Sequence, residues 1–345
     1  MNILIVTDAW SPQVNGVVRT LQSVKAELER MGHKVTVISP DQFRSMPCPT
    51  YPEIRLALTL SVGKSIDAAA PDAIHIATEG PLGLAARKHC RRKKLPFTTA
   101  YHTQFPEYVS KRTKLPASWF WRYIRRFHRP SKAVMVSTPA VEKQLHDNGI
   151  PHTRHWGRGV DLSLFTVDGR RHPAFEGLAG PIQLYVGRVA IEKNIAAFLD
   201  ARHPGTKVVV GDGPSLDKLK AEHRQVKFLG KLLGEELASA YRSADVFVFP
   251  SRTDTFGLVL IEALATGTPV AAYPVQGPID VLNDEVGCMD EDLDRAIAQA
   301  LTRDRAACAR YAANFGWDES ARQFLDGLVP IQRTVAMQEP ALESA

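Results

Sequence analysis

Two acidic residues, Asp254 and Glu262, are the strongest candidates for chemistry in this chain of 345 residues. They flank the start of a helix predicted near Gly257, directly after an apolar strand predicted over 245–249. Backbone N–H groups at a helix start suit a phosphate or a polarised hydroxyl, because they lack intrahelical partners. A carboxylate among apolar helix residues, such as Glu262, is costly to bury unless donors such as a ribose diol reach it. Asp254 could accept from sugar hydroxyls. Either acid alone is better explained by an ordinary helix entry, but the two together at this spacing favour a binding site.

Two cations follow a second predicted strand, over 182–186. Arg188 and Lys193 would therefore project from the carboxyl end of a parallel sheet, where ligands of such sheets bind. A departing diphosphate builds up negative charge that cations there stabilise. Two solvated loop charges are about as good an interpretation of either residue alone. Gly211 and Gly213 follow a neighbouring predicted strand and allow close approach of the backbone.

Polar residues also follow strands predicted in the first half of the chain. His102 comes directly after a strand predicted over 97–101, which would place it in a cleft, although a lone histidine is more often a satisfied polar group than a catalyst. Gly16 precedes the first predicted helix and would let the backbone approach a phosphate. Asp8 and Glu79 hold similar positions and could face a second substrate.

Short β-branched runs alternate with amphipathic helical stretches along the whole chain, which predicts an α/β fold. We expect two Rossmann-like domains, each a doubly wound parallel sheet, that face each other across a cleft. A stretch rich in Gly, Pro and charge over 161–180 is the predicted linker. The predicted parts are an acceptor-binding domain over 1–165, a nucleotide-sugar-binding domain over 166–320, a C-terminal helix over 321–333 that packs back on the first domain, and a disordered tail over 334–345.

Together, these motifs resemble glycosyltransferase family 4, the retaining enzymes of GT-B fold, through nearly the whole chain. The resemblance implies that Arg188 and Lys193 bind the donor diphosphate and that Glu262 holds the ribose. It also implies that Asp254 and the backbone of Phe256, Gly257 and Leu258 hold the transferred sugar, which His102 touches. The family usually has Glu where this chain has Asp254, so the acid here reaches about one methylene less.

The same resemblance implies a mechanism and a donor class. The acceptor would attack from the front face while the leaving phosphate takes its proton, so no protein base is needed. The donor would be a UDP- or GDP-sugar, with the base read near Lys231 and Leu232. No cofactor or metal is expected, since the run 290–292 is interpreted as a helix cap and the four cysteines show no zinc-site spacing.

Positive charge is concentrated in one part of the chain. Residues 87–132 hold fourteen Lys and Arg against one acid, although the whole chain has a net charge of only +6. Within this stretch, aromatic residues and arginines alternate at helical spacing, which is typical of a helix lying in an anionic membrane interface. The alternative is that the aromatic face packs on the domain core. The membrane-facing or acceptor-facing candidates are Trp119, Phe120, Arg122, Tyr123, Arg125 and Arg126.

The predicted activity is transfer of a hexose or hexuronic acid to a membrane lipid such as diacylglycerol, forming an α-glycolipid. The alternatives are a GDP-mannose-dependent transferase acting on a phosphoinositol lipid or a cell-envelope glycan, a nucleotide-sugar epimerase of the same fold, and a non-catalytic binder. The N-terminus lacks a signal-peptide pattern, so we expect a cytoplasmic protein on the inner face of the membrane. Nucleic acid is not an expected partner, because no recognition module accompanies the charge.

Overall fold

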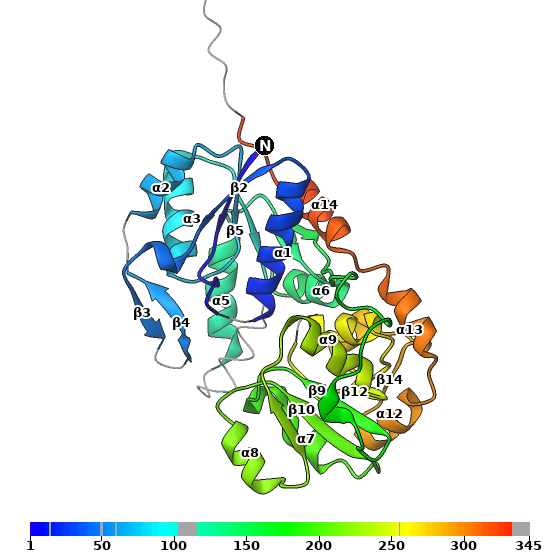
Figure 1. Ribbon diagram of the computed structural model, residues 1–345. Coiled ribbons are helices and arrows are strands. Elements are labelled where there is room, and N and C mark those ends of the chain that lie inside the picture. The colour runs from blue at the N-terminus through cyan, green and yellow to red at the C-terminus, as the bar shows by residue number, and fades with distance from the viewer. Residues whose placement is uncertain (14, 49–50, 59–60, 103–115, 255, 333–345) are drawn as a thin grey trace, which may run out of the picture.

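The computed structural model describes all residues except 14, 49–50, 59–60, 103–115, 255 and 333–345. It contains two α/β units, each built on a six-stranded sheet whose strands all run parallel (Figure 1). This confirms the predicted fold class. The tail predicted as disordered lies outside the described residues.

The sheet of the N-terminal unit has the order β2-β1-β5-β6-β7-β8. The last four residues of its first strand, 3–6, are all apolar and buried, as expected for a central strand with helices on both faces. The strands are β1 (Asn2–Val6), β2 (Lys34–Ile38), β5 (Ala73–Ile76), β6 (Thr98–Ala100), β7 (Val134–Val136) and β8 (Thr153–His155). The helices are α1 (Gly16–Arg30), α2 (Val62–Ala69), α3 (Pro81–Lys93), α5 (Ala117–His128) and α6 (Pro139–Asp147), and an antiparallel hairpin, β3 (Ser45–Cys48) and β4 (Tyr51–Ala57), lies outside the main sheet.

The sheet of the C-terminal unit has the order β11-β10-β9-β12-β13-β14, so its chain starts in the middle and reverses direction between β9 and β12. Loops at such a reversal point leave a crevice at the carboxyl ends of the strands. The strands are β9 (Ile182–Val186), β10 (Thr206–Val210), β11 (Lys227–Gly230), β12 (Val246–Phe249), β13 (Val270–Ala272) and β14 (Gly287–Met289). The helices are α7 (Ile195–Asp200), α8 (Leu216–Glu222), α9 (Gly234–Ser243), α10 (Leu258–Ala265), α11 (Pro278–Val281), α12 (Leu293–Ala300) and α13 (Arg305–Ala312).

The chain returns to the N-terminal unit through α14 (Trp317–Gly327), which runs beside α1 (Figure 1). Phe324 belongs to the same hydrophobic core as Leu21 and Trp156. The indole of Trp156 also donates to Ser320 Oγ at 3.2 Å. This helix therefore starts before the predicted position of 321.

The two crossings between the units lie side by side. Val160 N donates to Phe315 O at 2.9 Å, and a Cβ on Gly159 would meet the Trp317 Cα at 2.7 Å. Phe165 is already buried in the core of the C-terminal unit. The crossing therefore lies at the start of the predicted linker, because apolar residues within 161–180 pack on the C-terminal sheet.

Candidate active site

Lys193 and Asp254 meet at the reversal point of the C-terminal sheet. Lys193 ends the 3₁₀ turn Ile191–Lys193, which follows β9, and Asp254 lies in the loop after β12. Lys193 Nζ donates to Asp254 Oδ1 at 2.5 Å. Burial alone would raise the pKa of Asp254, but the charge and hydrogen bond of Lys193 hold that pKa below its ordinary value. The structure thus places a cation and a carboxylate, predicted separately, in one site.

The neighbouring loops pack backbone against backbone through glycines. A Cβ on Gly211 would lie 1.8 Å from Gly187 O, and one on Gly213 would lie 2.4 Å from Val189 O. Gly211 also has a φ of 145°, which L-residues rarely adopt. These glycines therefore fit the β10 loop against the loop that carries Arg188, and their contact with a ligand stays a prediction.

Arg188 is partly exposed in the loop after β9, and its carbonyl accepts from Tyr185 Oη at 2.9 Å. At the same edge of the sheet, the exposed Lys231 follows β11, and Leu232 is half-buried against the core. Phe256 is buried directly before the start of α10. Arg188 is therefore partly exposed and Lys231 is exposed, whereas the Phe256 side chain belongs to the core.

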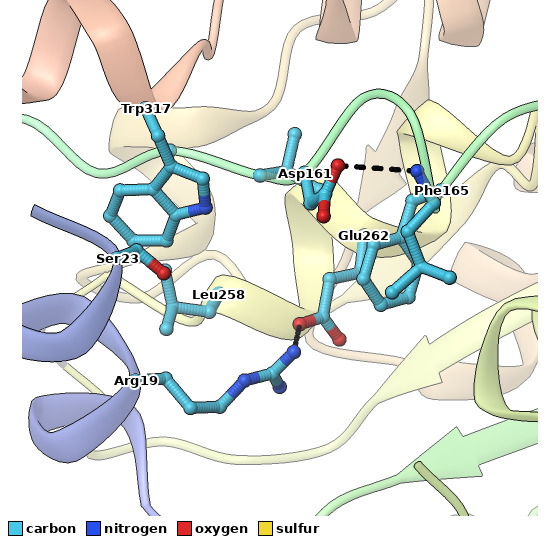
Figure 2. A pocket seen from close by; sticks show the side chains of 10 residues that line it. Arg19, Ser23, Asp161, Phe165, Leu258, Glu262 and Trp317 are labelled. Carbon is cyan, nitrogen blue, oxygen red and sulfur yellow. Dashed lines mark hydrogen bonds and ion pairs between the residues drawn. The ribbon is translucent and has the colours of Figure 1, made fainter. Parts of the chain in front are cut away.

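Glu262 is deeply buried, with only 3% of its surface exposed. Its Oε2 accepts from Tyr241 Oη at 3.0 Å. Its Oε1 pairs with Arg19 Nη2 at 2.5 Å, as Figure 2 shows. Burial raises the pKa of Glu262, and Arg19 and then Tyr241 oppose that rise. Sequence reasoning anticipated the acid and the need for donors, but it missed both donors found here.

The two units approach closely beside this carboxylate. The Asn15 side chain accepts from Val18 N at 3.0 Å and so caps α1, and a Cβ on Gly16 would lie 3.8 Å from Leu258 Cδ1. The N-termini of α1 and α10 therefore face each other. A pocket of about 170 Å³ lies at this junction and is lined by Arg19, Ser23, Gly159, Val160, Asp161, Leu164, Phe165, Leu258, Glu262 and Trp317.

His102 follows β6 in the N-terminal unit and is held by Arg158, a residue that sequence reasoning missed. Arg158 Nη2 donates to His102 Nδ1 at 3.1 Å, and Arg158 Nη1 donates to Trp156 O at 2.7 Å. Burial lowers the pKa of His102 well below its ordinary value, and the charge of Arg158 lowers it further. Burial also lowers the pKa of Arg158 itself to about 9. The position of Arg158, shortly after the edge strand β8, was the signal that could have found it.

Asp8 does not face a second substrate, contrary to the expectation from its position after β1. Its carboxylate accepts from Leu82 N at 2.9 Å and Thr78 Oγ1 at 2.8 Å, so it fastens the start of α3. A Cβ on Gly80 would lie 2.5 Å from that carboxyl group. Glu79, the other acid considered, contacts buried His128 at 3.3 Å.

The basic aromatic helix α5 divides its side chains between the core and the surface. Trp121 and Phe127 are buried, whereas 66% of Trp119 is exposed. Tyr123 donates to the carbonyl of Glu79 and is half-buried, as is Phe120. One aromatic face therefore packs on the core, as the alternative interpretation expected. The exposed face carries Trp119, Arg122, Arg125 and Arg126, and its contact with a membrane stays a prediction.

A groove of about 720 Å³ separates α5 from α3. Arg87 Nε donates to Phe127 O at 2.8 Å, which joins the two helices. In the described part of the chain, none of the basic residues in the groove forms an ion pair with a carboxylate. The groove is lined by Leu84, Arg87, Lys88, Arg91, Arg92, Tyr123, Arg126 and Phe127.

The described residues hold neither a candidate metal site nor a membrane-spanning helix. No group of three or more His, Cys, Asp or Glu side chains there is placed to hold a metal ion. No helix there is both long and apolar enough to cross a bilayer. The expectations of a metal-independent and cofactor-independent reaction remain predictions.

Known proteins are similar to this chain along most of its length. A family model described as Glycosyltransferase Family 4 matches residues 14–164, and one described as Glycosyl transferases group 1 matches residues 180–303. A GDP-mannose-dependent alpha-mannosyltransferase of Mycobacterium tuberculosis is 30% identical over 90% of both chains. The sulfoquinovosyl transferase SQD2 of Arabidopsis thaliana is 32% identical over 79% of this chain and 59% of its own length.

Two other similarities are informative. An alpha-monoglucosyldiacylglycerol synthase of Streptococcus pneumoniae is 29% identical over 87% of this chain and 78% of its own. The solved structure of a sucrose-phosphate synthase from Thermosynechococcus elongatus superposes with a TM-score of 0.76, at 22% identity over 94% of this chain and 97% of that one. The two parallel-sheet units and this superposition show the GT-B fold. The family models and the named relatives show that the protein is a glycosyltransferase. The chain belongs to glycosyltransferase family 4.

Proposed function

We propose that this glycosyltransferase moves a hexose or hexuronic acid, with retention of configuration, from a UDP- or GDP-sugar to a membrane lipid. The observation that carries the proposal is the Lys193–Asp254 pair at the reversal point of the C-terminal sheet. Lys193 and Arg188 bind the diphosphate, and Asp254 accepts from hydroxyls of the transferred sugar. Glu262 holds the ribose, and the nucleobase lies near Lys231 and Leu232. The backbone of 256–258 borders the sugar.

The chemistry requires positive charge where the leaving group forms. The bond from the sugar C1 to the β-phosphate oxygen breaks, and the acceptor oxygen bonds to C1 on the same face. The acceptor proton passes to the leaving phosphate oxygen, so charge builds on the diphosphate, where Arg188 and Lys193 stabilise it. Gly16, at the start of α1, adds a backbone N–H that faces this region. His102, held neutral by burial, donates to a sugar hydroxyl from the N-terminal unit.

The groove between α3 and α5 supports a lipid acceptor and binding to an anionic membrane. Its basic residues face one another without acids, and burial together with Arg91 and Arg126 lowers the pKa of Arg87. Trp119, which is largely exposed on the same helix, suits the membrane interface. The relative named for monoglucosyldiacylglycerol synthesis is in keeping with a lipid acceptor. The protein would then act on the inner face of the cytoplasmic membrane.

Product analysis tests the reaction. The protein is incubated with UDP- or GDP-hexoses and with vesicles containing diacylglycerol, a phosphoinositol lipid or neither, and products are identified by mass spectrometry. A glycolipid of α configuration, formed only with a matching donor, supports the proposal. Conversion of the donor sugar without any acceptor would make the protein an epimerase, and nucleotide binding without any product would make it a binder.

Vesicle co-sedimentation tests the membrane surface separately. Arg122→Glu, Arg125→Glu and Arg126→Glu together should weaken binding to anionic vesicles by about tenfold or more, most strongly at low salt. Lys218→Glu, Lys220→Glu and Arg224→Glu together, exposed on and just after α8, are the matched charge reversal and should have little effect. Equal binding by both variants would mean that α5 packs on the core and does not bind the membrane.

A further inference from the structure

Arg19 reaches the carboxylate of Glu262 from the opposite unit. It lies on α1, one turn after Gly16, and its Nη2 is 2.5 Å from Glu262 Oε1 on α10 (Figure 2). The Arg19 side chain is 39% exposed, whereas that of Glu262 is only 4% exposed. A cation of the N-terminal unit therefore contacts the buried acid of the C-terminal unit.

The hydrogen bonds of Glu262 leave acceptor capacity on both carboxylate oxygens for a diol. An ionised carboxylate has about four acceptor positions, two on each oxygen. Arg19 takes a position on Oε1, and Tyr241 takes one on Oε2. Each oxygen keeps capacity for one further donor, which matches the two adjacent hydroxyls of a ribose.

The charge on Arg19 also decides whether Glu262 can act as an acceptor. Burial favours the protonated form of this carboxyl group, and the charge of Arg19 is the larger of the effects that oppose protonation. A protonated carboxyl would turn one of its oxygens into a donor and lose capacity to accept from the diol. Tyr241 supplies a hydrogen bond to the carboxylate but no charge.

We propose that Arg19 is a donor-positioning residue that the N-terminal unit supplies to the C-terminal nucleotide site, where it orients Glu262 toward the ribose. The inference rests on the proposed function, because it takes Glu262 as the group that holds the ribose. Nucleotide recognition then depends on both units, since α1 must stay against α10 for the carboxylate to accept from the diol.

Calorimetric titration of the full chain with UDP and with GDP, from mildly acidic to mildly alkaline pH, tests the inference. Arg19→Gln should raise the Kd of the bound nucleotide by about tenfold at neutral pH. The loss should grow as the pH falls, because the pKa of Glu262 rises without the cation. Arg19→Lys keeps the charge and should recover most of the affinity. Arg30→Gln, at the far end of the same helix where the guanidinium pairs with Glu27 at the surface, is the control.

Several outcomes would overturn the inference. An unchanged Kd would make Arg19 a simple contact between the units, and a lower Kd would make it a competitor of the nucleotide. A loss that is equal at every pH, or that Arg19→Lys does not recover, would reflect altered structure. If the unmodified protein bound neither nucleotide, the proposed function itself would fail. If it bound one and Arg19→Gln bound equally well, only the role of Arg19 would fail.

Discussion

Lys193 Nζ lies 2.5 Å from Asp254 Oδ1, although the two residues are 61 positions apart in the sequence. They meet because β9 and β12 are neighbouring parallel strands whose carboxyl ends open on the same crevice. Within this pair, each charge neutralises the other. A bound nucleotide sugar would present its phosphate to Lys193 and its sugar hydroxyls to Asp254. The two residues of the pair would then contact different parts of the donor.

The carboxylate at 254 should be essential, whereas its length should matter less. Asp254→Asn removes the charge and should lower kcat/KM by about a hundredfold or more, since the lysine loses its partner and the sugar loses an acceptor. Asp254→Glu, the residue usual in the family, should keep much of the activity. Initial rates over a range of donor concentrations separate the two variants. Near-normal rates for Asp254→Asn would remove the acid from the site.

His102 should remain neutral well below the pH at which an ordinary histidine gains a proton. Its folded pKa is lowered, so charging the imidazole at acid pH works against the folded structure. Arg158→Gln removes one cause of this lowering and should raise the pKa of His102, while burial keeps it below the ordinary value. A pH titration of the His102 ring followed by NMR measures the change. An unchanged pKa would mean that Arg158 supports only the backbone around Trp156.

Gly211 should tolerate no side chain. Gly211→Ala places a Cβ 1.8 Å from Gly187 O at a φ of 145°, and should cost about 2 kcal/mol or more of unfolding free energy. Gly177 also has a positive φ, but a Cβ on it would meet nothing within 4 Å, so Gly177→Ala should cost only about 1 kcal/mol. Urea unfolding of both variants makes the comparison, and equal losses would contradict the close packing of these loops.

Gly16→Ala should weaken donor binding and leave the stability of the fold almost unchanged. Among the described residues, the added Cβ would come within 4 Å of Leu258 alone, at 3.8 Å, so thermal stability should change little. A bound diphosphate in front of α1 would meet the new methyl group, and the KM for the donor should rise several-fold. Thermal melts and donor titrations provide the two readouts. An unchanged KM would place the diphosphate away from the start of α1.

A polar residue that follows a predicted strand was a useful signal, because parallel strands bring such residues to one edge. Lys193, Asp254 and His102 were singled out in this way. The two sheets were predicted from short β-branched runs that alternate with amphipathic helical stretches. The same rule failed for Asp8, which follows β1 but fastens α3 through contacts that its position alone does not reveal.

Partners from distant segments were not predictable. Arg19 lies in an amphipathic helix where an arginine is usually solvated, and nothing local marks its contact with Glu262 in the other unit. The burial of Trp121 and the exposure of Trp119 likewise depend on how α5 turns against the sheet. Helical spacing identified the aromatic residues, but tertiary packing decided which of them reach the surface.

The most direct test of the central claim is the rate of glycolipid formation by the unmodified protein and by Lys193→Ala, measured by mass spectrometry at saturating donor and acceptor. We expect product from the unmodified protein and a loss of about a hundredfold or more in the variant, with a retained far-UV circular dichroism spectrum of the variant as the control. Equal rates for the two proteins would contradict a donor diphosphate held at this site.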